Sequence, residues 1–138
     1  MEPKDILNKL LAYEDNCAAV QPGGKDHDLR SMMIDIILDT PPEEWSENWI
    51  SWLIDIVASP TEYFPLVIKA ADALRQAVEA GNTTAVWWDE DILDAVKDAE
   101  NNFPLPIVLE ALSKLRACLT PGAADGASPR ANQGTVKS

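Results

Sequence analysis

Apolar side chains recur along most of the chain at intervals of three or four residues, which is the spacing of one face of an α-helix. Turn-forming residues divide this pattern into six segments, among them residues 21–24 (Gln-Pro-Gly-Gly) and Gly81. The predicted helices cover about residues 6–20, 28–39, 41–58, 61–80, 87–100 and 103–119. No useful length of sequence alternates between apolar and polar residues as a half-buried strand does, so the pattern predicts an all-α fold.

Two of the predicted helices begin with a similar local pattern, in which a hydroxyl residue is followed by proline and, three positions on, by glutamate. Residues 40–43 are Thr-Pro-Pro-Glu, and residues 59–62 are Ser-Pro-Thr-Glu. This is the sequence of a capping box with proline in the first helical turn. The pattern therefore predicts helix starts at about residues 41 and 61.

An internal repeat emerges when the sequence is shifted by 39 residues. The aligned positions are Trp49 with Trp88, Asp55 with Asp94, Val57 with Val96, and the Phe-Pro-Leu of residues 64–66 with that of residues 103–105. After a two-residue insertion the agreement continues at an offset of 41, where Val67, Leu74 and Arg75 meet Val108, Leu115 and Arg116. The repeat predicts that Trp49 and Trp88 occupy equivalent positions, buried or half-buried.

A repeat of two helices over about 40 residues is typical of HEAT-type arrays. Residues 59–74 resemble the second helix of a HEAT unit, because a proline-bearing turn leads to the basic residue Lys69. The resemblance implies three antiparallel helix pairs stacked in one domain over residues 1–120. An irregular six-helix bundle is the alternative. Residues 121–138, rich in Gly, Ala, Ser and Asn, are predicted to be a disordered tail.

The chain contains 11 Lys and Arg residues against 23 Asp and Glu, a formal net charge of −12. Residues 1–120 carry −13, and the acidic excess is spread evenly along them. Such a body repels phosphate and anionic lipid, which disfavours direct nucleic-acid and membrane binding and suits a basic protein partner. The longest uncharged run has nine residues, too short for a membrane span, and the N-terminus lacks a signal-peptide pattern. We therefore expect a cytoplasmic protein.

The sequence offers little chemistry for catalysis. Its one histidine, His27, lies between Asp26 and Asp28 and has no second histidine with which to share a metal ion. Cys17 and Cys118 fall within apolar helical patterns and are interpreted as small buried residues. No phosphate-binding glycine loop and no nucleophile motif are present. We expect a protein without enzymatic activity, cofactor or metal ion.

One acidic surface is the candidate site for binding a partner. Asp91, Asp94 and Asp98 are spaced to share one helix face, and Trp87 and Trp88 precede them closely. In a stack of helix pairs, the acidic start of the helix at residues 41–58 would lie beside the acidic start of the helix at residues 87–100. The predicted surface comprises Glu43, Glu44, Glu47, Trp87, Trp88, Asp89, Glu90, Asp91, Asp94 and Asp98. A solvated outer layer explains the same residues without a partner.

A competing surface is predicted on the second helix of each pair. Its charged residues are Asp35, Asp39, Lys69, Asp72, Arg75 and Glu79.

Residues 42–120 resemble bacterial immunity proteins of the HEAT-like kind, through the helix beginning at Trp88 (residues 88–93) and the Phe-Pro-Leu turn at residues 103–105. The resemblance implies a non-enzymatic inhibitor that neutralises a cognate toxin, and an acidic surface would fit the basic cleft of a toxin that acts on nucleic acid or nucleotides. Two alternatives stay open. One is a phage-encoded inhibitor that mimics nucleic acid and displaces it from a host enzyme, and the other is a general scaffold or adaptor.

Overall fold

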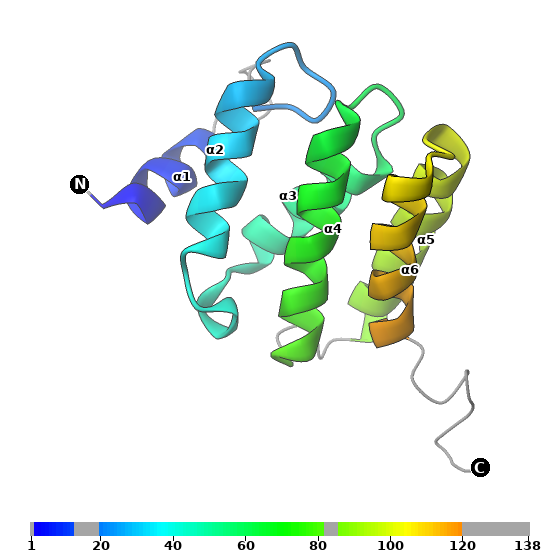
Figure 1. Ribbon diagram of the computed structural model, residues 1–138. Helices are drawn as coiled ribbons and strands as arrows, with labels where there is room; N and C mark the ends of the chain where they lie inside the picture. The colour runs from blue at the N-terminus through cyan, green and yellow to red at the C-terminus, as the bar shows by residue number, and fades with distance from the viewer. Residues whose placement is uncertain (1, 13–19, 82–85, 120–138) are drawn as a thin grey trace.

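The computed structural model describes residues 2–12, 20–81 and 86–119, with the backbone alone for residues 86–89 (Figure 1). Within these residues the protein is all-α, as the apolar spacing predicts, with six α-helices, one short 3-10 helix and no strand. The elements are α1 (Pro3–Ala12), α2 (His27–Leu38), the 3-10 helix η2 (Pro42–Glu44), α3 (Glu47–Ala58), α4 (Phe64–Glu79), α5 (Val86–Asn102) and α6 (Pro106–Leu119).

The helices form two layers. In one, α4 lies between α2 and α6 and contacts both; in the other, α3 contacts α1 and α5 (Figure 1). Contacts of α1 with α2, α3 with α4 and α5 with α6 join the layers. We call α2, α4 and α6 the even layer, and α1, α3 and α5, with η2 preceding α3, the odd layer. That the three helix pairs stack as they do in a HEAT-type array stays a prediction.

The hydrophobic core lies between the two layers, and α3 is its most heavily buried helix. Seven of the twelve α3 residues are buried, because α3 packs against α1, α4 and α5. Two tryptophans of α3 also make buried or partly buried hydrogen bonds. Trp49 Nε1 donates to Asn8 Oδ1 of α1 at 2.7 Å, and Trp52 Nε1 donates to the Val20 carbonyl at 2.9 Å. These bonds tie α3 to α1 and to the segment that precedes α2.

The helix starts near residues 41 and 61 differ from the predicted ones. Residues 42–44 form the 3-10 helix, and α3 begins at Glu47, where the Ser46 hydroxyl accepts a hydrogen bond from the Trp49 N–H. The Thr40 hydroxyl donates instead to the Ile36 carbonyl at the end of α2. Serine is a strong N-cap residue, so Ser46 sets the start of α3 in place of the predicted capping box.

The Ser-Pro-Thr-Glu pattern of residues 59–62 does not cap a helix either, because α4 begins at Phe64 and Glu62 binds elsewhere. Similarly, α6 begins at Pro106, so Pro104 lies in the connection and not in the predicted first turn. A proline disfavours the α conformation in the residue before it, which explains why closely spaced prolines delay the helix.

Burial follows the internal repeat. At an offset of 39, α3 and α5 begin at equivalent residues, and the buried residues Leu53 and Val57 match the buried residues Ile92 and Val96. Asp55 and Asp94, which the same offset aligns, are both exposed. At an offset of 41, the buried residues Val67 and Leu74 of α4 match Val108 and Leu115 of α6.

Trp49 is buried with 3% of its surface exposed, as the repeat predicts. The side chain of Trp88 lies outside the described residues, as do Cys17 and the predicted tail at residues 121–138.

One buried ion pair joins α2 to the loop that leads into α4, and its carboxylate also binds the loop before α2. Arg30 and Glu62 are both buried, and the guanidinium donates to both carboxylate oxygens, with Nη2 to Oε1 at 2.6 Å and Nε to Oε2 at 3.1 Å. The backbone N–H groups of Gly23 and Tyr63 also donate to this carboxylate, at 2.9 and 2.8 Å. Gly23 has a φ of +83°, and a Cβ there would collide with the Thr61 hydroxyl, so the close approach of the loops requires glycine.

Candidate protein-binding surface

Charge is divided unequally between the two layers. Helices α2, α4 and α6 contain five acidic and five basic residues, whereas η2, α3 and α5 contain ten acidic residues and one basic residue, Lys97. The remaining helix of the odd layer, α1, carries Lys4 and Lys9 against Asp5, so the acidic excess collects in the η2, α3 and α5 part of that layer. This layer includes every residue of the surface predicted from the sequence.

In the even layer, carboxylates are paired with cations of the same layer. Lys69 of α4 binds Asp35 of α2 at 2.5 Å. Arg75 binds Asp72 at 2.6 Å and Glu79 at 2.9 Å. The charges of the competing surface therefore largely neutralise one another through these ion pairs.

In the odd layer, most carboxylates lack such pairing. Glu90, Asp91, Asp94 and Asp98 are exposed on α5, and none forms an ion pair with any side chain in the described part of the chain. Glu100 differs, since it binds Arg116 of α6 at 2.6 Å. Unpaired, exposed carboxylates on one face produce a negative potential that extends into solvent.

Asp55 of α3 joins this cluster, although the sequence analysis did not include it. Partial burial of its carboxyl group raises the Asp55 pKa, and like charge on Asp91 of α5 raises that pKa further. The two carboxylates therefore repel each other across the contact between α3 and α5. The internal repeat aligns Asp55 with Asp94, and this alignment could have identified Asp55 as a member of the cluster from the sequence. We call Asp55, Glu90, Asp91, Asp94 and Asp98 the acidic edge.

The expectation that the acidic starts of α3 and α5 lie side by side stays a prediction. The charge interaction between Asp91 and Asp55 links a residue five positions into α5 with one eight positions into α3. Glu44 lines a hollow of about 330 Å³ together with Lys4 and Asp39, between the start of α1 and the end of α2. Glu43, Glu44 and Glu47 are exposed, and the side chains of Trp87, Trp88 and Asp89 lie outside the described residues.

Replacement of Asp55 by Asn is expected to raise the melting temperature slightly at pH 7. A carboxyl group whose pKa is raised by folding binds its proton more tightly in the native state, so its ionisation costs stability. The advantage of Asp55→Asn should be absent below the unfolded-state pKa and should grow as pH rises through the raised native pKa. Thermal melts from pH 3 to 8 measure this dependence, and a difference that is constant with pH would contradict it.

The remaining candidate chemistry has structural explanations. His27 stacks on Tyr63 with the ring centroids 4.5 Å apart, and no group of three or more His, Cys, Asp or Glu residues within the described ranges is placed to hold a metal ion. Cys118 is half-buried and donates to Glu79 Oε2 at 3.6 Å; burial, and then the Glu79 charge, raise its pKa. A raised pKa suppresses the reactive thiolate.

No protein-family model, curated protein or solved structure matches the chain significantly. Among the helices that the structure describes, none has both the length and the apolar character needed to cross a membrane.

Proposed function

We propose that this protein is a non-enzymatic inhibitor that binds a basic protein partner through the acidic edge. The observation that carries the proposal is the segregation of charge, with ten acidic residues against one basic residue in η2, α3 and α5. Solubility alone requires net charge but does not require that it collect in one layer. The pairing of the even-layer carboxylates favours the acidic edge over the competing surface.

A cationic partner would relieve the repulsion between Asp55 and Asp91. In the free protein, burial and then the like charge of Asp91 raise the pKa of Asp55. An arginine or lysine placed between them would stabilise both ionised forms, so binding would lower the Asp55 pKa towards its ordinary value. Interfaces that match opposite charge gain mainly in association rate and in specificity.

The partner that fits best is a bacterial toxin whose active cleft binds a phosphate-containing substrate. Such a cleft must be basic to attract phosphate, and the acidic edge presents carboxylates to the same cations. Occupation of the cleft would exclude the substrate and inhibit the toxin. This is the activity of an immunity protein, which the resemblance over residues 42–120 also implies.

The test compares two variants with equal changes in net charge. In the first, Asp91, Asp94 and Asp98 are replaced by Lys; in the second, Asp28, Asp35 and Glu79 of the even layer are replaced by Lys. Partners retained from the native cell by each variant and by the wild type are compared by quantitative mass spectrometry. We expect a basic protein that the wild type and the second variant retain and the first variant loses.

The purified partner then allows two further measurements. Stoichiometric wild-type protein should abolish its activity. The Asp91/Asp94/Asp98 variant should associate about tenfold or more slowly at low salt, because electrostatic steering contributes roughly 10- to 1,000-fold to such rates. Its association rate should also depend less on ionic strength. Equal retention of the partner by both triple variants, or a partner that stays active in the complex, would contradict the proposal.

A further inference from the structure

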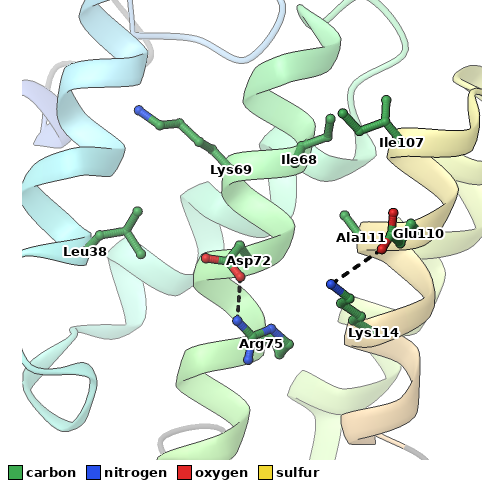
Figure 2. Close-up of a pocket in the computed structure, with 9 residues that line it drawn as sticks. All are labelled: Leu38, Ile68, Lys69, Asp72, Arg75, Ile107, Glu110, Ala111 and Lys114. Carbon is green, nitrogen blue, oxygen red and sulfur yellow. Dashed lines mark hydrogen bonds and ion pairs between the residues drawn. The ribbon is translucent and has the colours of Figure 1, made fainter.

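The even layer carries a groove with an apolar floor, and none of the acidic-edge residues lines it. It has a volume of about 340 Å³ and is lined from all three even helices. Figure 2 shows Ile68 of α4 and Ile107 of α6 at one end of the groove, with Leu38 reaching in from α2. Charged side chains of α4 and α6 form the other end, and these are Asp72, Arg75, Glu110 and Lys114.

The apolar end of the groove is unusually exposed. Ile107 has 58% of its surface exposed, the largest fraction among the large apolar residues that the structure describes. Leu105, in the connection before α6, and Leu109 of α6 are also exposed, at 39% and 37%, but they do not line the groove. A highly exposed apolar side chain at a groove with a polar rim is typical of a surface that contacts another protein.

We infer that this groove binds a second copy of the same chain. The choice of occupant rests on charge. The groove itself is lined by two acidic and three basic side chains, so it has little excess charge with which to attract a strongly charged partner. A second copy brings the same nearly balanced set of charges, whereas a contact through η2, α3 and α5 would set ten acidic residues against ten.

The groove is also suited to contact its own copy about a twofold axis. In a twofold interface, a residue i of one copy meets residue j of the other, and j meets i in return. Glu110 and Lys114 lie one turn apart on α6 and form only a loose pair, at 3.7 Å, with both side chains at least 65% exposed. Two antiparallel α6 helices centred near Leu112 would let Glu110 of each copy bind Lys114 of the other. Ile107 of each copy would then contribute to the apolar contact.

Such a dimer would leave both acidic edges facing outward and free to bind two basic partners. It would also respond to salt in the opposite sense to partner binding. Each copy has a net charge of −12, so the two copies repel each other at long range, and salt screens that repulsion without weakening apolar contact. Dimerisation should therefore strengthen as salt is added, whereas binding of a basic partner should weaken.

The test is sedimentation equilibrium on the full chain over a range of protein and NaCl concentrations. The wild type is expected to dimerise with a Kd in the micromolar range, as small transient interfaces do. Ile107→Asp should raise the dimer Kd at least about tenfold, because it places a charge in the apolar part of the contact. Ile6→Asp is the matched control, since Ile6 is 41% exposed on α1, away from the groove, and the dimer should persist.

Three outcomes overturn the inference. The first is a wild type that stays monomeric at roughly 500 µM, far above a micromolar Kd. The second is a dimer that survives Ile107→Asp, and the third is a dimer lost equally in Ile6→Asp. Circular dichroism of each variant shows whether its helices are intact. The proposed function is tested separately, because the Asp91/Asp94/Asp98 variant should lose the partner and keep the dimer.

Discussion

Replacement of Glu62 by Ala is expected to destabilise the protein by about 3–5 kcal/mol, the usual cost of removing one partner of a buried ion pair. The change leaves the buried Arg30 guanidinium without its counter-ion. It also removes the acceptor for the backbone N–H groups of Gly23 and Tyr63. The loops before α2 and α4 would then lose their main polar connection, which is why we expect a large effect from a residue outside any helix.

Urea denaturation at pH 7 measures this change in the free energy of unfolding. A double variant, Arg30→Met with Glu62→Leu, should recover much of the loss, because apolar side chains of similar volume remove the uncompensated charge. Asp35→Ala is the control, since it breaks an exposed ion pair with Lys69 that is worth about 1 kcal/mol or less. A Glu62→Ala variant as stable as the control would show that the buried pair does not hold the two loops together.

The helical architecture could be predicted from the sequence because the information is local. The apolar spacing that predicted helices at about residues 41–58 and 61–80 is the same spacing that buries Leu53, Val57 and Leu74 between the layers. The helix starts were predicted less well. Similar capping patterns occur at residues 40–43 and 59–62, yet neither glutamate caps a helix, because Ser46 and a distant arginine change the local outcome.

The features that the sequence did not predict depend on contacts between distant residues. Arg30 and Glu62 are 32 residues apart, and no local pattern marks them as partners. The acidic residues are distributed evenly along the chain, so their segregation is visible only once alternate helices are assigned to separate layers. Asp55 was missed for the same reason, since its significance comes from Asp91 on a neighbouring helix.

Replacement of Trp52 by Ala is expected to destabilise the protein by about 3–5 kcal/mol, the range found when a buried aromatic side chain is truncated to Ala. Trp52 is 1% exposed and is among the largest fully buried side chains of the described residues. Its loss would open a cavity where α3 packs against its neighbouring helices, which are α1, α4 and α5. It would also leave the Val20 carbonyl without the indole N–H that now donates to it at 2.9 Å.

Trp52→Phe separates these two contributions, because phenylalanine keeps most of the apolar volume and lacks the N–H donor. A buried carbonyl left without a partner costs about 1–3 kcal/mol, so Trp52→Phe should lose roughly that much and less than Trp52→Ala. Ser51→Ala, at an exposed position of the same helix, should change the free energy of unfolding by less than about 0.5 kcal/mol. If Trp52→Phe were as stable as the wild type, the hydrogen bond from Trp52 to the Val20 carbonyl would not contribute to the stability of the fold. If Trp52→Ala were equally stable, α3 could not be the centre of the core.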